Sequence, residues 1–235
     1  MTGTERHTIL PTMKALLAIM LLAGMASHGI AAETDVLWNN LTEVQQRDLL
    51  EGKTVETEEN VEGSAWPRFR VYQLVKAEPK SIAAVFWDCR RDPEYIPNCT
   101  AVTILSHPSP SVIEATYTLA MPFLLPDEVY VSKNVLRKPS ETSYEITWNV
   151  SEARYTKSAM GSLRIEPHGQ GSILRYANLV IPGSRIAGLL RATAGSQVVE
   201  SVKALTRRVE RMRDHDRTTL AAEEETLAHD LEGTR

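Results

Sequence analysis

The sequence predicts an α+β domain in which an antiparallel sheet packs against a long C-terminal helix. Between Arg68 and Ile181, most segments alternate apolar and polar residues and are separated by Pro, Gly and Ser, a pattern typical of consecutive antiparallel strands. After Pro182-Gly183-Ser184 the apolar period changes from two to about 3.6, which indicates an amphipathic helix. Such a helix buries its apolar stripe on the preceding sheet.

The composition is that of an ordinary globular protein. Of 235 residues, 43% are hydrophobic and 24% are charged, and the formal net charge is −4. The length fits one domain of roughly 150–200 residues with additional segments at its ends. Because the chain lacks a basic excess, we expect no nucleic-acid partner. No 18-residue apolar run follows residue 32, so the main body is not expected to cross a membrane.

Residues 1–32 have the three parts of a secretory signal. Arg6 and Lys14 precede an apolar run from Ala15 to Ala26, and small residues end the segment at Ala31-Ala32. The alternative, an uncleaved membrane anchor, needs a run longer than this one. The signal predicts a periplasmic or secreted protein whose mature chain begins near Glu33.

Residues 33–65 are predicted to form a helical and acidic N-terminal extension. Leu37, Leu41, Val44 and Leu49 have helix-compatible spacing, with Asn39 or Thr42 as the residue that caps the helix. Five glutamates and a single lysine follow before residue 63. The extension precedes the first expected strand, Arg68–Lys76, which alternates and is rich in β-forming residues.

A short helix is expected from Pro79 to Trp87, because proline is tolerated in a first helical turn. Six further strands follow it, mostly joined by short connections that indicate an antiparallel meander. Their expected ranges are Thr100–Leu105, Val112–Met121, Val129–Leu136, Thr142–Val150, Ala159–Glu166 and Ser172–Ile181.

The long helix is expected from Ser184 to Arg213, with one apolar stripe along its length. Its later half, Lys203–Arg217, carries six basic and three acidic residues. This segment either contacts an anionic membrane surface transiently or is a solvated helix end. Residues 214–235 contain few large apolar side chains, and we expect a solvated, acidic tail there, either helical or mobile.

Cys89 and Cys99 are the two cysteines of the chain. They flank a turn containing Pro93 and Pro97, which could bring the two ends together. In an oxidising compartment they could form a disulfide, whereas the alternative is a pair of buried thiols that pack as small hydrophobes. The sequence leaves both open.

The order of these elements resembles that of the START-like (SRPBCC) superfamily, which includes lipid-transfer domains, polyketide cyclases and coenzyme Q-binding proteins. The most suggestive stretch is AVFWDCRRDPEYIPN, ending at Asn98, where a short helix leads through Asp and Pro-Glu-Tyr-Ile-Pro into the next strand. The resemblance covers about residues 66–213. It implies a helix-grip fold, in which a curved antiparallel sheet of about seven strands wraps the C-terminal helix around an apolar cavity.

The alternation of side chains suggests which residues would line such a cavity. On the strand that contains Trp148, the face carrying Tyr144, Ile146 and Val150 should point inward. Two other strands leave the inner face open: Val131 and Lys133 or Tyr130 and Asn134 on one, and Leu174, Tyr176 and Asn178 or Arg175 and Leu179 on the other. The candidate ligand-binding residues are Tyr117, Asn134, Trp148, Tyr176, Leu190, Ala194 and Gly195. Each aromatic could instead be an ordinary core residue.

Small residues in the first half of the long helix favour open space beside the sheet, or else a close approach of helix and sheet. No catalytic motif is present, and no cofactor or metal is expected. Asp88, Asp92 and Glu94 are expected at a helix end and a turn. We therefore expect a carrier of a hydrophobic small molecule or lipid, not an enzyme. A polyketide cyclase or aromatase using the same cavity is the alternative, and a partner-binding module with a filled core is the third.

Overall fold

The computed structural model describes residues 37–121, 125–151, 153–183 and 191–233, and for residues 191–194 the backbone alone. The predicted signal at residues 1–32 lies outside these ranges, as do residues 184–190, where the long helix is expected to begin. The helical segments are η1 (Leu37–Asn40), α1 (Glu43–Leu50), α2 (Pro79–Trp87), η2 (Cys89–Glu94), α3 (Arg191–His215) and α4 (Arg217–Glu232). The strands are β1 (Val55–Glu59), β2 (Arg68–Val75), β3 (Cys99–Ser109), β4 (Val112–Leu119), β5 (Glu128–Arg137), β6 (Tyr144–Ser151), β7 (Thr156–His168) and β8 (Gly171–Pro182).

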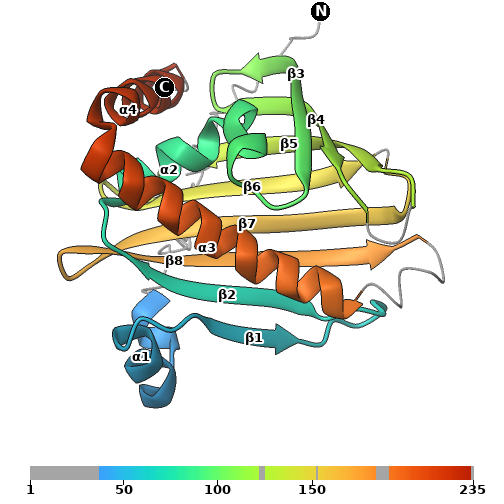
Figure 1. The fold of residues 1–235 in the computed structure, drawn as a ribbon, viewed down its shortest axis with the longest axis horizontal. Helices are drawn as coiled ribbons and strands as arrows, with labels where there is room; N and C mark the ends of the chain where they lie inside the picture. The colour runs from blue at the N-terminus through green and yellow to red at the C-terminus, as the bar shows by residue number, and fades with distance from the viewer. Residues whose placement is uncertain (1–36, 122–124, 152, 184–190, 234–235) are drawn as a thin grey trace, which may run out of the picture. The chain divides into compact units, whose positions relative to one another are not determined.

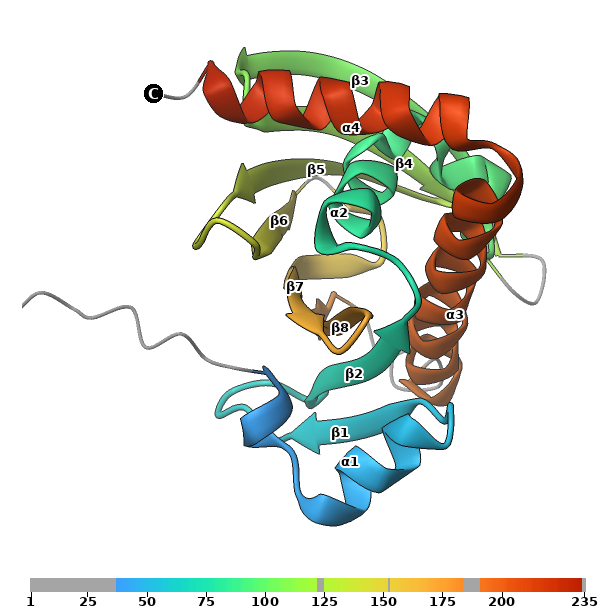
Figure 2. The same cartoon turned by 90° about the vertical axis from the view of Figure 1, so that its left-hand side faces the viewer.

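All eight strands belong to one antiparallel sheet with the order β1-β2-β8-β7-β6-β5-β4-β3. Consecutive strands from β3 to β8 pair as the meander that the turn spacing predicts. Figure 1 shows α3 crossing in front of the sheet, and Figure 2 shows the sheet curving so that its concave side faces α2 and α3.

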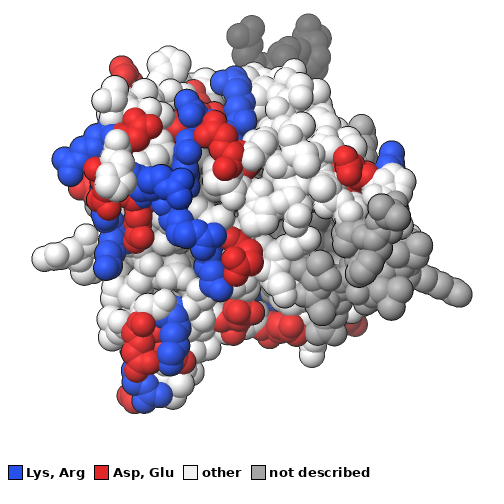
Figure 3. Space-filling view, in the orientation of Figure 1, with Lys and Arg blue, Asp and Glu red and all other residues white. Residues whose placement is uncertain are grey.

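Helix α3 has one apolar and one charged side, as its sequence predicts. Val202, Leu205 and Val209 are buried in the main core, whereas Arg207 and Arg211 are exposed. Figure 3 shows Lys and Arg side chains gathered over this helix, with acidic side chains among them. Among the described residues, no helix is both long enough and apolar enough to cross a membrane.

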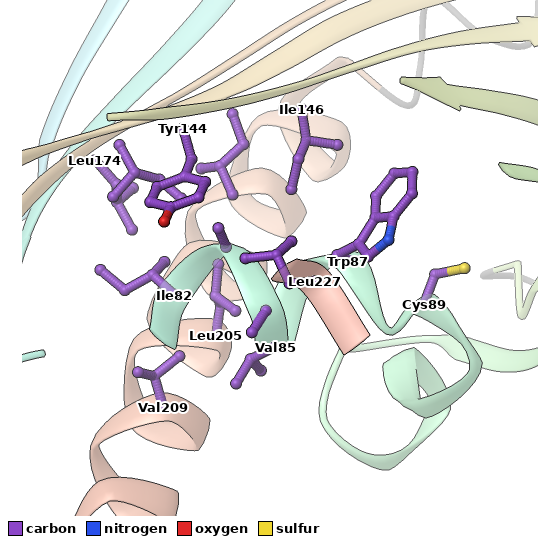
Figure 4. Packing of buried hydrophobic residues seen from close by; sticks show 14 of the residues in the cluster. Ile82, Val85, Trp87, Cys89, Tyr144, Ile146, Leu174, Leu205, Val209 and Leu227 are labelled. Atoms are coloured by element: carbon purple, nitrogen blue, oxygen red, sulfur yellow. The ribbon is translucent and has the colours of Figure 1, made fainter. Parts of the chain in front are cut away.

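The main core lies between the concave face of the sheet and the three helices α2, α3 and α4. Figure 4 shows Ile82 and Val85 of α2 and Leu205 of α3 clustered on the side of the sheet from which Tyr144 and Leu174 project. Helix α2 is apolar on nearly all sides because it is covered by the sheet on one side and by helices on the other. It therefore joins the sheet to both C-terminal helices.

A second, smaller core lies on the opposite face of the sheet. Alternation along β2 directs Val71 into the main core and Tyr72 into this second cluster. The cluster also contains Leu37, Leu41 and Leu49 from the N-terminal extension. Helix α1 begins at the cap Thr42, one of the two expected residues, whose side chain accepts a hydrogen bond from the Gln45 amide.

The structure differs from the expectation at both ends of the domain. The sheet has eight strands instead of about seven, because Val55–Glu59 in the acidic extension pairs with β2. There the carboxylate of Glu59 lies against the guanidinium groups of Arg68 and Arg70. The C-terminal segment expected to be a solvated tail forms α4, which packs on α2. In both cases the composition of the segment suggests exposure to solvent. Pairing with β2 orders the first segment, and packing on α2 orders the second.

A candidate ligand cavity

A cavity of about 240 Å3 lies between the concave face of the sheet and helices α2 and α3. Helices α2 and α3, η2 and the turn that follows η2 contribute Phe86, Trp87, Asp92, Ile96, Ser201, Val202 and Leu205. The strands contribute Cys99, Tyr117, Leu119, Glu128, Tyr130, Ser132, Asn134, Ile146, Trp148, Val150, Thr156, Ala159, Tyr176, Asn178 and Val180. The lining is mostly apolar and aromatic, as is typical of small-molecule sites.

Strand register places the central part of this lining. Asn178, Gly161, Trp148 and Asn134 lie directly opposite one another across β8, β7, β6 and β5. Side chains opposite one another on antiparallel strands share a face of the sheet. Because Gly161 has no side chain, the indole of Trp148 lies over it, and a Cβ at this position would overlap the indole and the Ala177 carbonyl oxygen. Gly161 therefore leaves the space that the Trp148 indole occupies.

The predicted site residues divide into three groups. Tyr117, Asn134, Trp148 and Tyr176 all line the cavity, so the open choices of strand face resolve to Tyr130 with Asn134 and to Tyr176 with Asn178. Leu190 lies outside the described residues, as does the side chain of Ala194. Gly195 is not among the lining residues.

The position of Gly195 has a simple physical cause. A Cβ built on Gly195 would lie 3.3 Å from the Phe69 ring of β2, so this part of α3 packs closely on the sheet. The small residues of this helix were expected either to leave open space beside the sheet or to let the helix approach the sheet closely. At Gly195 the second interpretation is correct. Helix α3 borders the cavity further along, through Ser201, Val202 and Leu205.

Aromatic rings form one wall of the cavity. Trp148 packs against Tyr176 with ring centroids 4.9 Å apart, and Phe86 of α2 lies 5.9 Å from Trp148. Tyr117 and Tyr130 are stacked with centroids 5.3 Å apart. Offset and edge-on arrangements of this kind stabilise aromatic clusters beyond their burial alone. The wall offers flat apolar surfaces to a ligand.

A chain of hydrogen bonds fixes the polar groups between these rings. The Ser132 hydroxyl donates to Oδ1 of Asn134 at 2.8 Å, and Nδ2 of Asn134 donates to the Tyr117 hydroxyl at 3.3 Å. Burial raises the pKa values of Tyr117, Tyr130 and Tyr176 above the ordinary tyrosine value, so these hydroxyls stay protonated at physiological pH. Oδ1 of Asn178 is buried and receives no hydrogen bond from the described residues.

Asp92 is one of the lining residues that sequence reasoning missed, together with Phe86, Glu128 and Ser132. Residues Asp88, Asp92 and Glu94 read as a helix end and a solvated turn, but the Asp92 side chain is only 7% exposed and lines the cavity. The Tyr95 hydroxyl donates to Oδ1 of Asp92 at 2.9 Å. Burial raises the pKa of Asp92 to about 8. Turn propensity describes the backbone of η2 and carries no information about which side chain the turn directs inward.

The described part of the lining contains two carboxyl groups and no Lys, Arg or His. Glu128 is the second carboxyl, and the backbone N–H of Tyr155 donates to both of its oxygens, at 3.2 and 2.9 Å. Four charged strand residues, Arg70, Glu114, Lys133 and Arg175, do not line the cavity, and neither does Arg154, which lies in the connection between β6 and β7. Among the described residues, no cluster of His, Cys, Asp and Glu is arranged to hold a metal ion.

Both cysteines are buried free thiols in the structure. Burial raises the pKa of each thiol to about 12, so the reactive thiolate is scarce in the folded protein. We expect iodoacetamide at pH 8 to label the folded protein over hours and the unfolded protein within minutes, without reductant. The extent of labelling is measured over time from the mass of the intact protein. A protein that is labelled in denaturant only after reduction would instead contain the Cys89–Cys99 disulfide.

No protein-family model matches the chain, and no curated protein matches it. Solved structures do match. A STAR-related lipid transfer protein fragment from Xanthomonas axonopodis aligns with a TM-score of 0.61 and 19% identity, covering 68% of this chain and 94% of that one. Human STARD10 aligns with a TM-score of 0.54 and 12% identity over 74% and 84% of the two chains. The Zhui aromatase/cyclase from a Streptomyces species aligns with a TM-score of 0.51 and 14% identity, covering 62% of this chain and 94% of that one.

This chain has the START-like helix-grip fold. At these identities the likeness is one of fold, and it confirms the architecture that the order of elements predicts. The START-like fold can hold different functions, since the similar structures include a lipid transfer protein and an aromatase/cyclase. The function must therefore be argued from the cavity itself.

Proposed function

We propose that this protein binds and carries a hydrophobic small molecule or lipid in the cavity between the sheet and α3. The observation that carries the proposal is the aromatic cavity itself, held open beneath α3 on a START-like fold. Its volume of about 240 Å3 is slightly below the roughly 300–1,000 Å3 that ligand pockets span. A compact ligand with fused or single rings suits this space better than a long, two-chain lipid.

A polyketide cyclase or aromatase using the same cavity is the alternative. A histidine or an arginine–carboxylate pair deep in the cavity would favour catalysis, because it would supply an acid and a base to a bound substrate. The described lining contains neither. The cavity is therefore better suited to binding than to acid–base chemistry, and the carrier is the function we favour.

We also propose that the carrier is exported, on the strength of the predicted signal at residues 1–32. N-terminal sequencing of protein from its source cells tests this, with Glu33 as the expected start. Transient contact with an anionic membrane is proposed for the outward side of α3, where Lys203, Arg207 and Arg211 follow one another at helical spacing.

The test of the carrier function uses N-phenyl-1-naphthylamine, an uncharged probe whose fluorescence rises in apolar surroundings. The wild-type protein is expected to bind it, and Ala159→Leu is expected to abolish binding because Ala159 lines the cavity and is 8% exposed. Native mass spectrometry of protein from its source cells should show a bound small molecule. The same spectrum of Ala159→Leu should show the unliganded mass.

Ala101→Leu is the matched control. It adds the same bulk on β3, where Ala101 is exposed and outside the cavity lining. This variant should bind the probe like the wild type. Equal binding by all three proteins would place the probe elsewhere and would contradict the proposed carrier function, as would a wild type that binds neither probe nor natural ligand.

A further inference from the structure

The polar groups of the cavity are unsuited to an anionic ligand. In the described lining the hydrogen-bonding groups are hydroxyls, amides and the two carboxyls Asp92 and Glu128. A carboxylate or phosphate placed here would lose its hydration and meet no cation, which is costly in an apolar environment. The chemistry of the lining therefore selects against the charged head groups that many lipids carry.

Asp92 lies among groups that satisfy only part of its hydrogen-bonding capacity. The Tyr95 hydroxyl donates to Oδ1 of the carboxyl group at 2.9 Å. The nearby cations are engaged elsewhere, since Arg208 pairs with Glu94 at 2.8 Å and Arg91 contacts Asp88, Glu94 and Glu223. A protonated Asp92 would therefore have an O–H to donate into a cavity that is also lined by the aromatic residues Tyr117, Trp148 and Tyr176.

We propose that Asp92 is the specificity-determining residue of the cavity: its carboxyl group donates a hydrogen bond to a carbonyl oxygen of an uncharged, aromatic or polycyclic ligand. Ketones, quinones and esters share this acceptor chemistry. The inference rests on the proposed carrier function and adds the class of ligand that the carrier takes.

The environment of Asp92 supports the protonated form. Its pKa is raised to about 8, chiefly by burial and further by the charge of Asp88, so it is mostly protonated at neutral pH. Each element packed around the turn that contains Asp92 contributes titratable or charged groups that face Asp92 or the turn. The α2–η2 segment contributes Asp88, Cys89, Arg91, Glu94 and Tyr95. The other elements contribute Cys99 from β3, Tyr117 from β4, Glu128 and Tyr130 from β5, Tyr176 from β8, Arg208 from α3 and Glu223 from α4.

The experiment displaces N-phenyl-1-naphthylamine with three compounds of nearly equal size. These are 2-acetylnaphthalene, which has a carbonyl acceptor, 2-ethylnaphthalene, which has none, and 2-naphthoate, which is charged. At pH 6.5 the wild type should bind the ketone about tenfold more tightly than the hydrocarbon, the effect of one good hydrogen bond. It should bind 2-naphthoate most weakly. At pH 9.5, where Asp92 is ionised, the preference for the ketone should disappear.

Two variants separate hydrogen bonding from packing. Asp92→Asn has the same shape and a permanent N–H donor, so its preference for the ketone should persist at both pH values. Asp92→Leu has no donor and should bind ketone and hydrocarbon equally at both. If Asp92→Leu does not fold, the comparison of wild type with Asp92→Asn still tests the proposal, because only the wild type should lose its preference for the ketone at pH 9.5.

The contrary outcomes are distinct. Equal binding of ketone and hydrocarbon by the wild type at pH 6.5 overturns the role of Asp92 and leaves the carrier function standing. Tighter binding of 2-naphthylmethylamine than of the ketone also overturns it, because Asp92 would then act as a carboxylate that pairs with a cation. If the wild type does not bind N-phenyl-1-naphthylamine or any of these compounds, the carrier function fails, and the inference fails with it.

Discussion

Replacing Leu227 with alanine is expected to lower the free energy of unfolding by about 2–5 kcal/mol, the range for truncating a fully buried leucine. Leu227 lies on α4 with no exposed surface and belongs to the main core together with Leu220. The helix is also held by two polar contacts to α2, from Nε1 of Trp87 to Asp230 at 2.8 Å and from the Ser81 hydroxyl to Glu224. Chemical denaturation monitored by circular dichroism measures the change.

Thr226→Ala is the matched control, because Thr226 precedes Leu227 on the same helix and is exposed. A surface substitution of this kind changes stability by at most about 0.5 kcal/mol. If both variants were equally stable, the C-terminal segment would be the solvated tail that its acidic composition suggests. A large effect of Leu227→Ala alone means that α4 completes the core beside Trp87, a residue that also lines the cavity.

The second large effect concerns the stability of Asp92→Asn as a function of pH. The pKa of Asp92 is about 8 in the folded protein and near 4 in the unfolded chain. Between these values the folded state binds more protons than the unfolded state, so the stability of the wild type falls as pH rises through this window. Asp92→Asn does not titrate there and should become the more stable protein by on the order of 3–5 kcal/mol above pH 8.

Urea denaturation at a series of pH values from 4 to 9 measures this difference. The titration of Glu223, whose pKa burial raises to about 7, is present in both proteins and cancels in the comparison. Tyr95→Phe offers an independent check, because the Tyr95 hydroxyl stabilises the ionised form and its removal should raise the pKa of Asp92 further. A difference between wild type and Asp92→Asn that stays constant across the series would mean that Asp92 is solvated.

The part of the structure that follows from local pattern was predictable from the sequence. Alternation identified the inward face of β6, where Tyr144, Ile146 and Trp148 are buried. The change of period after Ser184 identified α3 and its apolar side. The turn residues between strands set the connections of the meander, and the resulting order of elements sufficed to indicate the helix-grip fold.

Other features depend on residues far away in the sequence. On β5, the choice between Val131 with Lys133 and Tyr130 with Asn134 followed only from pairing with β4 and β6. The spacing of Leu220, Leu227 and Leu231 is a helical stripe that could have signalled α4, but a core must exist on which it can pack.

The sequence by itself thus determined strands β2 to β8, the long helix and the candidate lining residues Tyr117, Trp148 and Tyr176, since each depends on a period of two or of about 3.6 along the chain. Only the tertiary structure decided that Asp92 faces the cavity, that Gly195 is covered by Phe69, and that β1 and α4 are ordered. The reason is physical. Burial and the hydrogen-bond partners of a side chain depend on which distant segments lie beside it, and local periodicity does not contain that information.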